Sequence, residues 1–118
     1  MVAHLVHKNQ EGKLAVVAIF FKKGEKNDFI ETLWKNLPNH EGKEKVVGNV
    51  SINVKNILPT NKSYYNYSGS LTTPPCSEGV NWNVIKASMP ISEAQVAKFV
   101  SLFELSVRPV QPLNGRAF

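Results

Sequence analysis

The sequence is poor in cysteine and lacks long apolar runs. Its single cysteine, Cys76, cannot close a disulfide within the chain, so it is either a buried free thiol or a half-cystine whose partner lies outside the chain. The longest apolar run, residues 14–21, is too short to cross a membrane. Residues 1–10 lack the basic segment followed by an apolar stretch that marks a secretory signal. We therefore expect a soluble chain with no membrane partner, and nothing in the sequence names a compartment.

A basic patch is also lacking. The net charge of +5 comes from 14 Lys and Arg against 9 Asp and Glu, which would suit a polyanion if the basic residues were clustered. Only Arg108 and Arg116 are arginines, and the lysines are scattered singly or in pairs such as Lys22 with Lys23. This distribution is typical of a solvated surface, and we expect no nucleic-acid partner.

The chain has room for one domain, and its pattern is mostly β. Residues 14–22 are β-branched and aromatic with almost no polar interruption, which predicts a central strand buried on both faces. In residues 80–86, apolar residues alternate with Asn81 and Asn83, so Trp82 should point to a defined face. The strands that we expect span residues 4–8, 14–22, 46–54, 64–71 and 80–86.

Two amphipathic helices are expected beside these strands. Asp28, with Glu31 three residues later, has the pattern of a helix N-cap and precedes an apolar stripe that ends at Pro38. Ser92 and Gln95 repeat the same pattern before a second stripe. Both stripes favour helices that pack on a sheet rather than recognition helices. The predicted fold class is therefore mostly β (α+β).

Three histidines suggest a zinc site, but their spacing does not support one. His4 and His7 are three residues apart on an expected strand, so their side chains should point to opposite faces. His40 lies in a polar segment that is typical of an exposed loop. The sequence thus offers one well-placed ligand at most, and one imidazole does not hold zinc tightly.

The run YSGSLTTPPCSEG, residues 67–79, places two threonines directly before two prolines. Each proline fixes its own φ and restricts the residue before it, so the segment should be rigid. A rigid loop that presents hydroxyl groups can orient a bound water or hydroxide. Structural turns use the same residues, and the local chemistry alone favours a turn.

Three blocks of sequence resemble the alpha-class carbonic anhydrases: AHLVHKN near the start, SGSLTTPPCSEGVNW, and RPVQPLNGR near the end. The cysteine after the double proline is similar to the bacterial branch. The resemblance covers the whole chain, but family members are roughly twice as long. It implies that residues 1–118 form a single partial domain whose amino-terminal half is absent. The implied fold is the carboxy-terminal part of a central twisted, largely antiparallel sheet with two short amphipathic helices.

The resemblance also implies an activity, the reversible hydration of carbon dioxide to bicarbonate and a proton at zinc. His4 matches the third zinc-binding histidine, and Thr72 matches the threonine that orients the zinc-bound hydroxide. Thr73 matches a neighbour that contacts bicarbonate, and Pro75 matches a proline that follows a cis bond. Cys76 matches a half-cystine of bacterial members, which implies a periplasmic or secreted parent protein. The apolar wall for carbon dioxide matches Val6, Val16, Leu71, Val80 and Trp82.

Two positions depart from the family. Val2 stands where the family has a glutamate that fixes the tautomer of the third histidine, and Ser106 stands where asparagine is usual. Since the chain matches only one of the three zinc histidines of the family, we expect the chain alone to bind no stoichiometric zinc and to be inactive. The expected partners are carbon dioxide or bicarbonate and a complementary amino-terminal half. The alternatives are a non-catalytic interaction module on the same scaffold and a homo-oligomer that forms through open strand edges.

Overall fold

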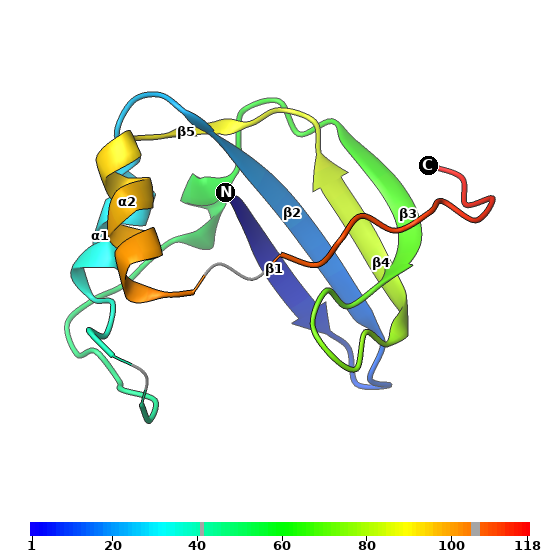
Figure 1. Cartoon of the computed structure of the whole chain (residues 1–118), viewed down its shortest axis with the longest axis horizontal. Coiled ribbons are helices and arrows are strands. Elements are labelled where there is room, and N and C mark those ends of the chain that lie inside the picture. The colour runs from blue at the N-terminus through cyan, green and yellow to red at the C-terminus, as the bar shows by residue number, and fades with distance from the viewer. Residues whose placement is uncertain (41, 105–106) are drawn as a thin grey trace.

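The computed structural model describes residues 1–40, 42–104 and 107–118 of the chain. The described residues form a mixed sheet, and two α-helices pack against each other at the end of the sheet where β5 lies (Figure 1). None of these helices is long and apolar enough to cross a membrane. The elements are β1 (Val2–Lys8), β2 (Leu14–Lys23), α1 (Asp28–Lys35), the 3-10 helix η1 (Val54–Ile57), β3 (Tyr64–Ser70), β4 (Glu78–Ile85), β5 (Met89–Ile91) and α2 (Glu93–Leu102).

The strands are arranged in the order β1-β2-β4-β3, and β5 pairs with the far end of β2. β1 runs antiparallel to β2, and β3 runs antiparallel to β4, whereas β2 is parallel to both β4 and β5. β2 is therefore the central strand, as its nearly unbroken apolar sequence predicts. The mostly β fold class with two short helices is confirmed.

Alternation along the strands gives the sheet two different faces. On β2, Val16 and Ala18 are buried on one face, in a cluster with Val80 and Trp82. Ile19 and its neighbours on the other face join the main core with α1 and α2. The first face is the one that carries the candidate site.

Both helices begin at a side-chain cap. Ser92 and Gln95 form the predicted capping box of α2, which is confirmed. The predicted cap of α1 was wrong by one residue, because Asn27 rather than Asp28 accepts the Ile30 amide hydrogen. Asp28 is instead the first helical residue, where a carboxylate interacts favourably with the helix dipole.

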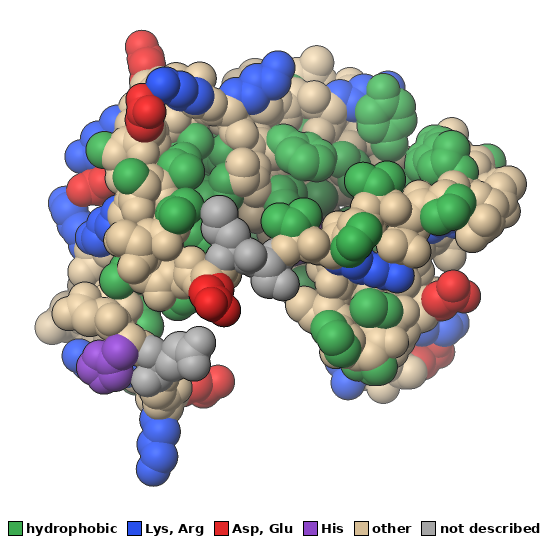
Figure 2. Space-filling model, in the orientation of Figure 1, with side chains coloured by type: hydrophobic (Ala, Val, Ile, Leu, Met, Phe, Trp, Pro, Cys, Tyr) green, Lys and Arg blue, Asp and Glu red, His purple; other side chains and the backbone are tan. Residues whose placement is uncertain are grey.

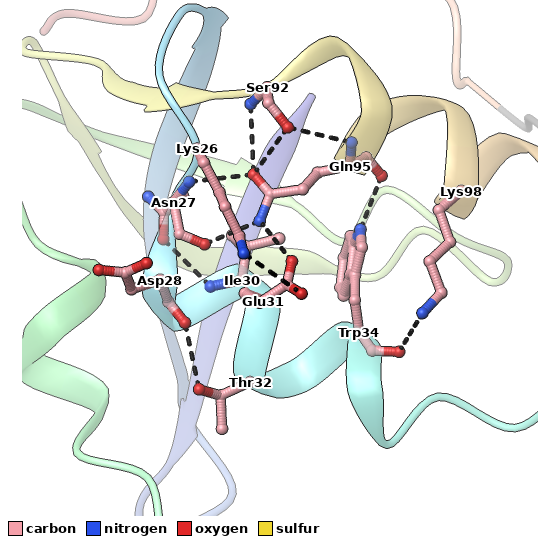
Figure 3. A network of polar contacts seen from close by, with 10 residues as sticks. All are labelled: Lys26, Asn27, Asp28, Ile30, Glu31, Thr32, Trp34, Ser92, Gln95 and Lys98. Atoms are coloured by element: carbon pink, nitrogen blue, oxygen red, sulfur yellow. Dashed lines mark hydrogen bonds and ion pairs between the residues drawn. The ribbon is translucent and has the colours of Figure 1, made fainter.

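A buried polar contact joins the two helix starts (Figure 3). The Gln95 side chain is 4% exposed, and it accepts a hydrogen bond from the Asn27 amide (3.0 Å) and donates one to the Asn27 carbonyl (2.8 Å). The Trp34 indole donates to the Gln95 carbonyl at 2.7 Å. These bonds satisfy polar groups that would otherwise be costly to bury, and they fix how α2 packs on α1.

The sequence prediction of a strand over residues 46–54 was wrong. Gly48 and Asn49 form a turn in this segment, Asn49 has φ of 60°, and Val46 is 94% exposed. The segment has β-branched residues, but none of its residues pairs with a strand among the described residues. Strand propensity depends on such pairing and burial, so it does not produce a strand here. The short strand β5 was not predicted, because Pro90 lies at its centre.

Candidate functional site

One face of the sheet forms the floor of a cavity of ≈ 470 Å³, which the carboxy-terminal segment covers from the other side. This segment passes in front of β2 and β4 in Figure 1, and Figure 2 shows hydrophobic side chains exposed across the same face. Exposed apolar residues of this face include Val2 (39%), Phe20 (50%) and Tyr65 (51%). The cavity is lined by Val2, His4, Ala18, Phe20, Tyr65, Tyr67, Gly69, Ser70, Thr72, Trp82, Val84, Arg108, Pro109, Val110, Gln111, Leu113, Arg116 and Phe118.

His4 and Thr72 both line this cavity, although 68 positions separate them in the sequence. His4 lies on the edge strand β1 opposite Ala18 of β2. Its ring meets Trp82 edge to face, with the ring centroids 4.9 Å apart and the planes at 79°. Thr72 lies in the loop that follows β3. An imidazole and a hydroxyl from separate elements therefore face one space.

The environment of His4 favours its neutral form. The residue is exposed by area, but the packing of Trp82 against it removes part of its hydration, and this burial lowers the pKa of His4. A neutral imidazole is the form that can donate a lone pair to a metal or accept a proton.

The other two histidines do not join His4. His7 lines a separate groove with Leu5 and Val17 on the opposite face of the sheet, as the spacing of the two histidines predicts. His40 is exposed in the loop after α1. No group of three His, Cys, Asp or Glu side chains that could hold a metal ion occurs in the described part of the chain. The residues present therefore do not fit a complete zinc site.

The residues expected to form the apolar wall lie near one another, but they differ in burial. Val16 and Val80 are each 1% exposed and Trp82 is 6% exposed, and Leu71 packs against this cluster. Val6 pairs with Val16 across β1 and β2, yet its side chain is 59% exposed. Of these five expected residues, Trp82 is among those that line the cavity, whereas Val6, Val16, Leu71 and Val80 are not.

The loop of residues 71–77 holds Thr72 by short backbone contacts. The Leu71 amide donates to the Ser77 carbonyl at 2.9 Å, and the Cys76 amide donates to the Thr73 carbonyl at 2.8 Å. The peptide bond before Pro75 is cis, so the expectation for this bond is confirmed. Thr73 is exposed and is not among the residues that line the cavity. Cys76 is a half-buried free thiol.

Close packing at Gly69 supports the start of this loop. The Trp82 indole donates to the Ser70 carbonyl at 2.9 Å, and Trp82 also stacks on Tyr67. A Cβ atom at Gly69 would lie 2.8 Å from the Trp82 ring. Glycine is therefore required for this close approach of backbone and indole.

Sequence reasoning did not assign roles to Arg108, Arg116 and Phe118, which line the cavity from the carboxy-terminal segment. Arg108 Nη1 donates to Ser70 Oγ at 2.8 Å, and Phe118 packs on Tyr67 with centroids 5.3 Å apart. The block RPVQPLNGR contains both arginines, but its contacts with β3 depend on the tertiary fold. Ser106, which departs from the family pattern, lies outside the described residues.

Residues 4–118 match the family model of the eukaryotic-type carbonic anhydrases. A carbonic anhydrase of Klebsiella pneumoniae is 48% identical over 118 residues, and one of Nostoc sp. is 43% identical over 116 residues. Each alignment covers 98% of this chain, but only 47% and 44% of these relatives. The alpha-carbonic anhydrase of Thermovibrio ammonificans, solved with the inhibitor sulfanilamide, superposes with a TM-score of 0.92 at 43% identity. That match covers 98% of this chain and 51% of the solved chain, so the chain spans about half the length of its relatives.

Proposed function

This chain belongs to the eukaryotic-type carbonic anhydrase family, and on that basis we propose that it supplies the carboxy-terminal half of a site that hydrates carbon dioxide. The family is zinc-dependent and binds carbon dioxide and bicarbonate. The observation that carries the proposal is that His4, on β1, and Thr72, in the loop after β3, line one cavity. A metal ligand and the residue that orients the attacking oxygen must face one shared space for such a reaction.

In this proposal, the apolar cluster around Trp82 binds carbon dioxide, which has no net dipole and loses little hydration on burial. Trp82 lines the cavity directly, Val16, Val80 and Leu71 pack in the cluster behind it, and Val6 pairs with Val16 from β1. Thr72 holds the attacking oxygen by a hydrogen bond so that its lone pair faces the carbon atom. Thr73 is exposed outside the cavity lining, so the contact with bicarbonate that the resemblance assigns to it would be made as the product leaves the cavity.

Among the described residues, His4 is the one to which we assign a role as metal ligand. Catalytic zinc needs three protein ligands, and the described residues provide no such set. We assign the remaining ligands to a complementary amino-terminal half that covers the exposed apolar face beside β1. A disulfide from Cys76 to that half would require an oxidising compartment such as the periplasm or the cell exterior.

One observation favours a second candidate, a non-catalytic interaction module. Val2 shares the cavity face with His4, at the position where the family has a glutamate that fixes the histidine tautomer. Loss of such a group lowers metal affinity or activity by about 10–100-fold. A module that keeps the fold and binds a partner would not need that glutamate.

The test is complementation with the amino-terminal half of the Klebsiella pneumoniae relative. We expect the mixture to gain zinc at close to one ion per complex and to hydrate carbon dioxide faster than buffer in stopped-flow measurements. His4→Ala should abolish zinc uptake, whereas Thr72→Val should keep the zinc and lose about 100-fold in kcat. A stable complex that takes up no zinc would refute the enzymatic proposal and support the interaction module.

A further inference from the structure

The two peptide groups before Thr72 are held by two side chains from distant parts of the sequence. Arg108 Nη1 donates to Ser70 Oγ at 2.8 Å and also reaches the Leu71 carbonyl at 3.4 Å. From the other side, the Trp82 indole donates to the Ser70 carbonyl at 2.9 Å. Residues 70–71 are therefore fixed by one side chain from β4 and one from the carboxy-terminal segment.

We propose that Arg108 is a positioning residue, which acts through Ser70 and Leu71 to hold the Thr72 hydroxyl at the cavity. This inference rests on the proposed role of Thr72. Arg108 is half-buried and lines the same cavity, so its charge lies in the site that it organises. Arg108 can do this without touching the substrate.

The geometry of the peptide bond transmits this constraint. The Leu71 carbonyl and the Thr72 amide belong to one planar group, so a bond to the carbonyl oxygen also limits rotation of the amide that begins Thr72. The Leu71 amide is bonded to the Ser77 carbonyl at 2.9 Å. With both peptide groups of Leu71 bonded, Thr72 can move chiefly through its own torsions.

Arginine suits this task better than lysine. Both bonds come from one nitrogen, Nη1, and the planar guanidinium holds the two hydrogens of that nitrogen in fixed directions, toward Ser70 Oγ and the Leu71 carbonyl. A lysine at the same position keeps the charge but offers a compact ammonium group without that geometry. We therefore expect Arg108→Lys to restore part of what Arg108→Met removes.

Arg116 provides a matched control on the same segment. It also lines the cavity, but its guanidinium bonds the nearby carbonyls of Leu113 and Pro112 and reaches Ser68 only at 3.5 Å. Arg116→Met removes a charge of equal size without releasing the Ser70–Leu71 contacts. A general effect of charge on the fold would appear in both variants, whereas a positioning effect appears only at Arg108.

The first test is amide hydrogen exchange by NMR on the 118-residue chain. In Arg108→Met, we expect exchange at the Leu71 and Cys76 amides to accelerate about tenfold, because both amides close the Thr72 loop. The Trp82 indole resonance should shift, the Val84 amide should be unchanged, and Arg116→Met should resemble the wild type. Unchanged exchange at Leu71 and Cys76, or equal acceleration at Val84, would overturn the inference.

The second test uses the complex with the amino-terminal half. Arg108→Met should lower kcat about tenfold with KM and zinc content unchanged, and Arg108→Lys should recover part of the loss. A fall in zinc content that accounts for the lost activity would contradict a positioning role. If the wild-type complex is inactive, the proposed function fails, while the exchange measurement still decides the role of Arg108.

Discussion

Replacing Gly69 by alanine tests the packing that supports the Thr72 loop. The added Cβ atom would lie 2.8 Å from Trp82 Cδ1, 3.2 Å from Trp82 Nε1 and 3.0 Å from Tyr67 Cε2. Real Cβ atoms essentially never lie as close as 2.8 Å to another heavy atom, so Trp82 or the backbone at position 69 must shift. Trp82 cannot move freely, because it is 6% exposed, packs against His4 and donates to the Ser70 carbonyl.

Overpacking of this kind costs about 1–3 kcal/mol in the free energy of unfolding. Urea denaturation followed by far-ultraviolet circular dichroism measures that cost, and the Trp82 indole resonance reports whether the bond to Ser70 survives. Gly48→Ala is the matched control, since its Cβ atom meets nothing within 4 Å, and it should change stability by less than about 0.5 kcal/mol. A Gly69→Ala chain as stable as the wild type would refute the described packing.

Three further predictions follow from other contacts. Burial lowers the pKa of His4, so NMR should give this histidine a titration midpoint below about 6.5. The free energy of unfolding should fall as the pH drops from about 6.5 through that midpoint, because the unfolded chain binds the proton at a higher pH than the folded chain. A midpoint above 6.5 would contradict this prediction. Gln95→Ala should lower the free energy of unfolding in urea by about 1–3 kcal/mol, because the buried Asn27 amide loses its acceptor and the Asn27 carbonyl keeps only the Glu31 amide as a donor. A neutral effect would argue against the contact. Cys76 should react with a thiol reagent in the native chain, and this reactivity should disappear in an oxidised complex with the amino-terminal half; persistent reactivity would exclude the proposed disulfide.

The parts of the fold that the sequence predicts well are those where local pattern and tertiary environment agree. The unbroken apolar run of β2 matches its central place, and the alternation around Trp82 matches a strand with one face in the cavity. The capping box of Ser92 and Gln95 lies within a segment of four residues, so it can be recognised from the local sequence.

The errors in strand prediction have a common cause, because strand pairing depends on partners that are distant in the sequence. Residues 46–54 have strand-forming side chains, but the fold brings no strand beside them. β5 has a proline at its centre and three residues in all, yet the far end of β2 pairs with it. Neither outcome can be obtained from propensity alone.

In the candidate site too, the features set by local pattern could be predicted, and those set by the tertiary fold could not. The strand parity of His4 and His7 predicts correctly that they face apart, and the resemblance singles out Thr72. Arg108 could not be assigned, because its contact with Ser70 spans 38 positions and exists only in the folded chain. The roles of Thr72, Thr73 and the apolar wall stay predictions until the complex is measured.

Equilibrium dialysis of the 118-residue chain against zinc, followed by metal analysis and stopped-flow assay, tests most directly whether this chain holds only part of the site. We predict no stoichiometric zinc and hydration of carbon dioxide no faster than in buffer, because His4 alone cannot retain the ion. A zinc-to-protein ratio near one, with turnover that sulfanilamide suppresses, would contradict this account.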